Sequence, residues 1–222
     1  MGSNYSLKYN VDIVMCIDST GSMHGILDTV KKNALNFDGD LVEQAMKKGK
    51  QIDQLRIRVI SFRDYLADGE NAMLVTDFFD MPKEKEDFKN LVSSIKPDGG
   101  GDDPEDGLEA LAYAIKSKWT TGGDKRRHVI IVWTDASAHA LGFGKTSPYY
   151  PEKMAKTFNE LTGWWDQMDS RAKRLLIYAP EEEQWSSISN CWENTVFYPS
   201  EAGMGLEEYD YNVILNEILN SI

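Results

Sequence analysis

The chain has 222 residues, of which 41% are hydrophobic and 27% are charged, an ordinary globular composition with enough length for one sizeable domain. Its formal net charge of −12 argues against nucleic acid or an anionic membrane as the main partner, because both attract basic surfaces. The sequence has no run of 18 apolar residues, so we expect no membrane span.

The two cysteines, Cys16 and Cys191, stand far apart in the sequence. Cys16 lies in an apolar run, where a thiol behaves as a small hydrophobic group. We therefore expect no disulfide framework and a reducing compartment, and without a signal-peptide pattern we expect a cytoplasmic location. Gly2 and Ser6 match a myristoylation pattern, which chance or a cloning scar would equally explain.

Strand and helix patterns alternate in the first half of the chain. The unbroken apolar run 11–18 is typical of a strand covered on both faces, and helical spacing continues from Ser22 to about Lys48. Residues 54–65 and 71–81 predict a hairpin, and two helices are expected at 84–95 and 103–119.

The second half continues this alternation. A second buried strand is predicted at 128–135, and we interpret the basic run just before it, 124–128, as a solvated loop. A helix at 152–168, a strand at 174–180, a short helix, a strand at 195–200 and a helix at 206–219 complete the expected elements.

This order of elements predicts an α/β fold. We expect a doubly wound three-layer sandwich, in which a mostly parallel central sheet with one antiparallel edge strand lies between two layers of helices. No break in composition divides the chain, so a single domain is expected over 1–222, with its core at about 10–220. Ligands of such sheets bind beyond the carboxyl ends of the strands, where the strand order reverses.

Polar residues end both predicted buried strands and should meet at that edge. Asp18, Thr20 and Ser22 supply one carboxylate and two hydroxyls on alternate positions, and Asp135 ends the other strand. Carboxylates brought together without a cation would raise one another's pKa values. Because these donors are all oxygen atoms, they suit Mg²⁺, with Mn²⁺ or Ca²⁺ as alternatives.

A third acidic segment, 97–107, can reach the same edge. Asp103 followed by Pro104 predicts the start of a helix, which leaves Asp102 free to point at the cation. An EF-hand here would need an oxygen ligand at Pro104 and an acidic residue at Tyr113. A phosphate-binding loop would need a lysine after the glycines, so neither alternative fits.

With these motifs together, the sequence resembles a von Willebrand factor type A domain that carries a metal-ion-dependent adhesion site. Residues 18–22 match the family's Asp-x-Ser-x-Ser motif with threonine in the middle, Asp135 matches its third-loop aspartate, and Asp102 stands where the family has a threonine. The pair DSTGSM and GGGDDPE resembles the subgroup of hemicentins, alpha-kinase-linked domains and stand-alone bacterial domains. The resemblance spans about residues 10–220.

This resemblance implies a metal-dependent protein-interaction module whose partner is another protein, and it indicates no particular oligomeric state. With a threonine in the second loop, Mg²⁺ and two aspartates would be neutral and would attract an acidic ligand from the partner. Asp102 makes the total −1, which implies a more tightly held ion and a weaker grip on acidic partners.

Several other residues lie in the segments expected near the ion. His24 and His139 are interpreted as rim residues rather than direct ligands, because the remaining donors are all oxygen atoms. Asp103 is also expected close to the ion, as a neighbour of its ligands. The long connection 138–151 contains aromatic residues that either contact a partner or cover the core.

The alternative function is a Mg²⁺-dependent hydrolase or phosphatase-like enzyme in which Ser22 or a bound water attacks the substrate. A haloacid-dehalogenase-like site would need an aspartate at Thr20, and no lysine follows the glycines to stabilise a leaving phosphate. We therefore expect a binding module without enzymatic activity.

Overall fold

The computed structural model describes residues 8–25, 27–101, 103–199, 215–217 and 219–220. Its centre is a seven-stranded sheet with the order β3-β2-β1-β5-β6-β7, and β4 pairs with β2 beside β3. The strands are β1 (Tyr9–Asp18), β2 (Ile52–Phe62), β3 (Met73–Val75), β4 (Phe79–Met81), β5 (Lys125–Trp133), β6 (Lys173–Ala179) and β7 (Thr195–Pro199). The helices are α1 (Leu27–Lys47), α2 (Lys85–Ser94), α3 (Gly107–Ile115), α4 (Phe158–Gln167) and α5 (Glu183–Cys191).

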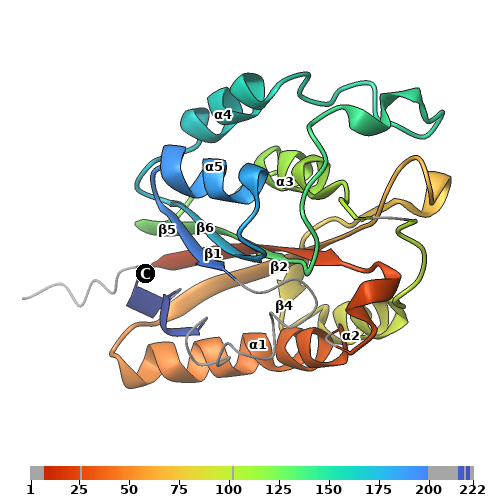
Figure 1. Cartoon of the computed structure of the whole chain (residues 1–222). Coiled ribbons are helices and arrows are strands. Elements are labelled where there is room, and N and C mark those ends of the chain that lie inside the picture. The colour runs from red at the N-terminus through yellow and green to blue at the C-terminus, as the bar shows by residue number, and fades with distance from the viewer. Residues whose placement is uncertain (1–7, 26, 102, 200–214, 218, 221–222) are drawn as a thin grey trace, which may run out of the picture.

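Helices cover both faces of the sheet, as the alternation predicts. Figure 1 shows α1 and α2 below the sheet and α3, α4 and α5 above it. Strand β1 supplies both cores: Ile13 and Met15 pack toward α1, while Val14 and Cys16 pack toward α3. The expected three-layer α/β sandwich is therefore confirmed.

The strand order reverses at β1. This strand pairs in parallel with β2 on one side, where Asp18 lies opposite Phe62, and with β5 on the other, where Ile17 lies opposite Trp133. Because the chain passes first to β2 and later to β5, the crevice at the carboxyl end of β1 is the switch point of the sheet.

The predicted strand at 71–81 is two short strands, so the antiparallel edge has β3 and β4 instead of one strand. Both pair with β2, and Thr76 lies between them. The Thr76 hydroxyl accepts a hydrogen bond from the Val59 amide at 3.0 Å. In a continuous strand a main-chain carbonyl would accept this hydrogen bond. This side-chain contact interrupts the ladder.

Three predicted helix starts are wrong. The chain after Asp18 forms a short 3-10 helix, η1 (Gly21–Gly25), before α1 begins. Helix α3 begins at Gly107 rather than near Asp103, because Asp103 is not a cap: its Oδ1 accepts from the Ser137 amide and hydroxyl. Helix α4 begins after Thr157, whose Oγ1 accepts from the Glu160 amide.

The basic run before the second buried strand is not a loop. Strand β5 begins at Lys125, so Arg126, Arg127 and His128 are strand residues paired with β1. Residues 125–127 pair with the start of β1, and this tertiary context outweighs the charged sequence.

Other expectations concern the chain termini and the cysteines. Residues 215–217 and 219–220 are helical, and the rest of the predicted 206–219 helix lies outside the described residues, as does Gly2. Cys16 is buried, Cys191 is exposed, and both are free thiols. Within the described ranges, no helix combines the length and apolar character needed to cross a membrane.

A buried ion pair fixes the amino end of β1. Asp12 is fully buried and accepts from Nε and Nη2 of Arg56 at 2.8 and 2.7 Å, and from the Thr120 amide at 2.6 Å. The aspartate therefore joins β2 to the segment that leads into β5. Removing one member of such a pair leaves the other charge without its partner.

We expect Asp12→Ala to lower the free energy of unfolding by about 3 kcal/mol, measured by urea denaturation, because Arg56 loses its carboxylate. The control is Glu43→Ala, which removes an exposed pair with Lys47 and should change stability little. Equal stability of Asp12→Ala and wild type would show that the pair does not hold this end of the sheet.

Candidate metal centre

A continuous chain of hydrogen bonds joins the four described residues that the sequence assigns to the ion. The Thr20 hydroxyl donates to Asp18 Oδ1 at 2.7 Å and lies 3.0 Å from Ser22 Oγ. Ser22 Oγ in turn donates to Asp135 Oδ1 at 2.9 Å. Residues from two loops, 113 positions apart, therefore place their oxygen atoms in one row.

The spacing of these oxygens fits a divalent cation. Octahedral ligands at about 2.1 Å from Mg²⁺ lie roughly 3.0 Å from one another. The three successive oxygen–oxygen separations, 2.7, 3.0 and 2.9 Å, are close to this value. Carboxylate and hydroxyl oxygens are also the donors that Mg²⁺ prefers. The residues present therefore fit the ion that the sequence predicts.

Electrostatics at this edge favour a cation. Asp18 is fully buried, and the loss of water raises its pKa to about 6, although Thr134 and Thr20 donate to the carboxylate. Burial likewise raises the pKa of Asp135. Two carboxylates that resist ionisation next to each other become stable as anions when a positive ion lies between them.

The described residues contain no group of three or more His, Cys, Asp or Glu side chains placed to hold a metal. This agrees with a donor set of two carboxylates and two hydroxyls. Asp102, the third predicted carboxylate, lies outside the described residues, between Gly101 and Asp103.

A glycine-rich segment runs past Thr20. Gly99, Gly100 and Gly101 all have positive φ, and the Gly99 carbonyl accepts from the Gly21 amide at 3.1 Å. A Cβ on Gly100 would lie 2.8 Å from Cβ of Thr20, so a side chain there would push the loop away from the candidate ligands.

The structure separates the three predicted rim residues. Asp103 is at the edge of the oxygen row and ties its own loop to Ser137. His24 is exposed in η1 and has no hydrogen-bond partner among the described residues. His139 is buried, with Nε2 at 3.1 Å from Asp64 Oδ2 and its ring stacked on Phe143.

A second acidic cluster, absent from the sequence-based expectations, lies close to Asp18 and Thr20. It consists of Asp64, Glu105, Asp106 and Glu109, all buried. Asp106 accepts from the Tyr65 amide at 2.6 Å, and Glu109 accepts from the Tyr150 hydroxyl at 2.8 Å. These contacts tie the start of α3 to the loops after β2 and β5.

Three oxygens of this acidic cluster have no hydrogen-bond partner, namely Glu105 Oε2, Asp106 Oδ1 and Glu109 Oε2. Burial, reinforced by the neighbouring carboxylates, raises the pKa of Glu105 to about 10 and that of Asp106 to about 7. Burial also raises the pKa of Glu109. Glu105 therefore retains its proton at neutral pH and Asp106 retains one in part, whereas isolated carboxyls would be ionised.

The sequence contains one indication of this acidic cluster. Asp106 and Glu109 are three residues apart at the start of a helix, so they share one face of its first turn. Asp64 and Glu105 come from separate loops, and only the fold brings them to that face.

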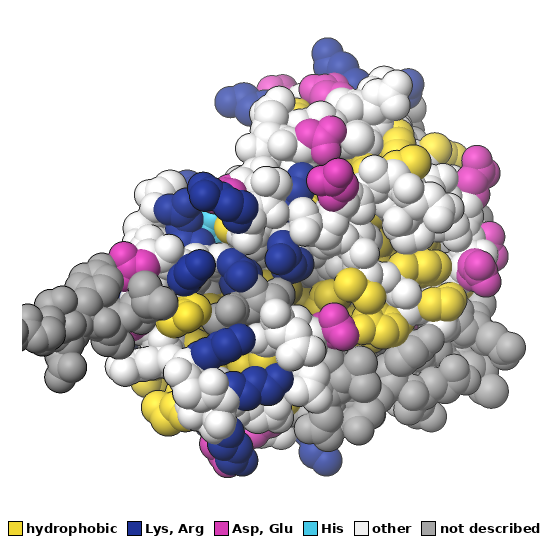
Figure 2. Space-filling model, turned by 90° about the vertical axis from the view of Figure 1, so that its left-hand side faces the viewer, with side chains coloured by type: hydrophobic (Ala, Val, Ile, Leu, Met, Phe, Trp, Pro, Cys, Tyr) yellow, Lys and Arg dark blue, Asp and Glu magenta, His cyan; other side chains and the backbone are white. Residues whose placement is uncertain are grey.

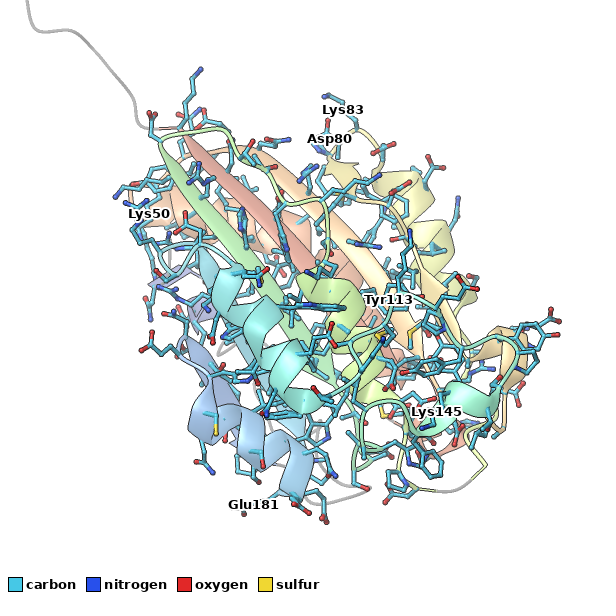
Figure 3. All side chains as sticks on the ribbon, turned by 90° about the horizontal axis from the view of Figure 1, so that it is seen from above. Lys50, Asp80, Lys83, Tyr113, Lys145 and Glu181 are labelled. Carbon is cyan, nitrogen blue, oxygen red and sulfur yellow. The ribbon has the colours of Figure 1, made fainter. Side chains whose placement is uncertain are left out.

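An apolar surface flanks this acidic cluster. Leu66, Phe143 and Tyr149 are about half exposed, with residue exposures of 47%, 52% and 53%. Their two loops are packed together, since the Tyr149 ring lies 3.4 Å from an ideal Cβ on Gly69. Figure 3 shows Lys145, between Phe143 and Tyr149 in sequence, at the carboxyl side of the sheet, far from Lys50 on the amino side. Tyr150, by contrast, is turned inward to Glu109.

The doubly wound sheet, with carboxylate and hydroxyl oxygens at its switch point, places the chain in the class of α/β domains whose ligand sites lie at the carboxyl edge of the sheet. The chain belongs to the von Willebrand factor A domain family, whose sequence profile matches residues 12–191.

One sequence relative and two solved structures are similar to this chain. The alpha-protein kinase vwkA of Dictyostelium discoideum is 23% identical over 141 residues, which are 64% of this chain and 21% of the kinase. The pilus adhesin SpaC of Lactobacillus rhamnosus GG has a TM-score of 0.58 at 11% identity, covering 95% of this chain and 30% of the adhesin. Proximal thread matrix protein 1 from the mussel byssus has a TM-score of 0.54 at 14% identity, covering 97% and 48%. This chain spans less than half the length of each.

The raised pKa of Asp106 makes stability depend on pH. The folded state binds a proton that the unfolded state releases above pH 4, so the free energy of unfolding should fall as pH rises from about 4 to 7. We expect Asp106→Asn to reduce this fall by about 2 kcal/mol in urea denaturation with EDTA present.

Asp87→Asn is the matched control, because Asp87 is exposed on α2. It should leave the pH dependence unchanged. A wild-type stability that rises over the same pH range, or an Asp106→Asn curve parallel to wild type, would contradict a protonated Asp106.

Proposed function

We propose that this chain is a metal-dependent protein-interaction module. Asp18, Thr20, Ser22 and Asp135 would hold Mg²⁺ together with Asp102, and Mn²⁺ or Ca²⁺ could replace it. The observation that carries this proposal is the hydrogen-bonded row of oxygens from Asp18 to Asp135 at the switch point. A bound Mg²⁺ would offer an open coordination position to an oxygen ligand of the partner.

The surface around the oxygen row supports a protein as the partner. Leu66, Phe143 and Tyr149 expose large apolar side chains on loops beside the acidic cluster. Phe143 is held in place by its stack on His139, at 3.9 Å between ring centroids, and His139 is held by Asp64. Rigid exposed aromatic side chains are typical of protein-interaction surfaces.

A binding role for Ser22 is favoured over a nucleophilic role. Its hydroxyl donates to Asp135 Oδ1, and no histidine among the described residues hydrogen-bonds to it. A serine nucleophile would need a base that accepts its proton and returns it to the leaving group. We therefore assign Ser22 as a ligand and propose no enzymatic activity.

Two further observations agree with this proposal. One of the similar solved structures is a pilus adhesin, which is consistent with recognition of other molecules by this fold. The free thiols of Cys16 and Cys191 are consistent with a reducing compartment such as the cytoplasm. We do not propose kinase activity for this chain, because it spans only about a fifth of the Dictyostelium kinase.

Metal binding is tested with Asp18→Asn, which keeps the size of the side chain but removes its charge. We expect Mg²⁺ to raise the melting temperature of the wild type and to leave that of Asp18→Asn unchanged, because only the folded wild type holds the ion. Calorimetry with Mn²⁺ should show one site per chain in the wild type.

Two neighbouring aspartates provide the matched comparison. Asp102→Thr should bind the metal at least tenfold more weakly, since one anionic ligand is lost, whereas Asp103→Asn should bind as the wild type does because Asp103 is tied to Ser137. Absence of metal binding in the wild type, or equal affinity in Asp18→Asn, would overturn the proposed centre.

Partner binding should depend on both the ion and the apolar surface. Proteins captured on the immobilised chain in Mg²⁺ should be lost in EDTA and on Asp18→Asn, and reduced on Phe143→Ser. Leu74→Ser, an exposed apolar residue of β3, is the control. A set of captured proteins that is the same in Mg²⁺ and EDTA would argue against metal-dependent recognition.

A further inference from the structure

Asp106 lies where the two loops that carry the exposed apolar surface meet the start of α3. Its Oδ2 accepts a hydrogen bond from the amide of Tyr65, the residue before Leu66, at 2.6 Å. An ideal Cβ on Gly144, the residue after Phe143, would lie 3.3 Å from the same oxygen. One carboxyl oxygen therefore lies against both loops, next to two of the residues that form the apolar surface.

The carboxyl groups on either side of Asp106 hold the same two loops. Asp64 binds the loop after β2 through main-chain amides, and Glu109 binds the loop after β5 through an amide and a hydroxyl. The donors are the Leu66 and Ala67 amides to Asp64 Oδ1, and the Gly142 amide and Tyr150 hydroxyl to Glu109 Oε1. Three neighbouring carboxyl groups therefore join the two loops to α3.

The groups that face Asp106 are mostly acidic or neutral. They are Asp64 and Tyr65 from the loop after β2, Glu105 and Glu109 from its own segment and α3, and His139 and Tyr150 from the loop after β5. Of these groups, His139 alone can carry a positive charge, and its Nε2 already lies 3.1 Å from Asp64 Oδ2. Ionisation of Asp106 would therefore add a negative charge beside other carboxyl groups.

No lysine or arginine in the described ranges forms an ion pair with Asp106. Arg63 donates instead to the Ser19 and Lys96 carbonyls at 3.1 and 3.0 Å, and the side chain of Lys145 is exposed. Many basic side chains gather at the other end of the sheet, at the amino ends of β5 and β6 (Figure 2). Asp106 is fully buried and its Oδ1 has no hydrogen-bond partner, so its anion is poorly stabilised in the closed structure.

Local opening of the two loops would let water reach Asp106. In the closed structure, burial and the neighbouring carboxylates raise its pKa to about 7, whereas a solvated aspartate ionises near pH 4. Between these values the closed form holds a proton that the open form releases. The equilibrium constant for opening should therefore rise by up to about tenfold per pH unit and level off above pH 7. The raised pKa of Glu109 acts in the same direction.

We propose that Asp106 is a pH-sensitive switch for the apolar surface: in its protonated form it holds the two loops against α3, and the loops open more readily as the proton is lost. The switch does not depend on the metal centre. Its consequence for recognition rests on the proposed function, because a partner that needs the closed surface of Leu66, Phe143 and Tyr149 would bind more tightly in mild acid than at neutral pH.

The test measures hydrogen exchange on the full chain in EDTA from pH 5 to pH 8, expressed as protection factors so that the intrinsic pH dependence of exchange is removed. The reporters are the amides of Tyr65, Leu66, Ala67 and Gly142, which the carboxyl groups hold. In the wild type their protection should fall at least tenfold from pH 5 to pH 7 and stay level above pH 7. Amides of β1, at the centre of the sheet, should be better protected at every pH.

Asp106→Asn should make the protection of these amides nearly independent of pH, and Asp87→Asn should behave as the wild type does. Glu109→Gln guards against a folding defect, because it keeps an acceptor for Gly142 and Tyr150 while removing one charge. It should reduce the fall in protection at least threefold. The proposal is overturned if wild-type protection is the same at pH 5 and pH 7, or if both cluster variants keep the wild-type fall. Equal protection of the loop and β1 amides would also overturn it, because the loops would then open only on global unfolding.

The outcome is separate from that of the metal-binding tests. Exchange is followed without a divalent cation, so a failure of the switch leaves the proposed metal centre standing. Absence of Mg²⁺ binding, in turn, would leave the pH dependence of the two loops unchanged.

Discussion

Asp18 carries an ionisable carboxylate to the end of a strand that is covered on both faces, where water cannot solvate the charge. Two hydroxyl groups, from Thr20 and Thr134, donate to its two oxygens, yet its pKa is still raised. A side chain in this position is stable as an anion only when something positive compensates it. The neighbouring row of hydroxyl and carboxylate oxygens, ending at Asp135, is what a divalent cation would use.

The acidic residues at this edge of the sheet fall into two sets that differ in their hydrogen bonding. Asp18 and Asp135 are linked by hydroxyl donors and suit a metal ion. Glu105, Asp106 and Glu109 have oxygens without partners, and burial raises the pKa of each. The first arrangement is suited to hold a cation, and the second joins the loops that carry the exposed apolar residues.

The sequence by itself determined the fold class and the candidate ligands, because a strand buried on both faces has a distinctive apolar run and its carboxyl end is the place where Asp18 and Asp135 must emerge. Local patterns failed where distant contacts decide. Asp103 has the sequence of a cap but binds Ser137, and the basic residues 125–127 extend a strand because they pair with β1. Only the tertiary structure brings Asp64, Glu105 and His139 together, since these contacts join residues that are far apart along the chain.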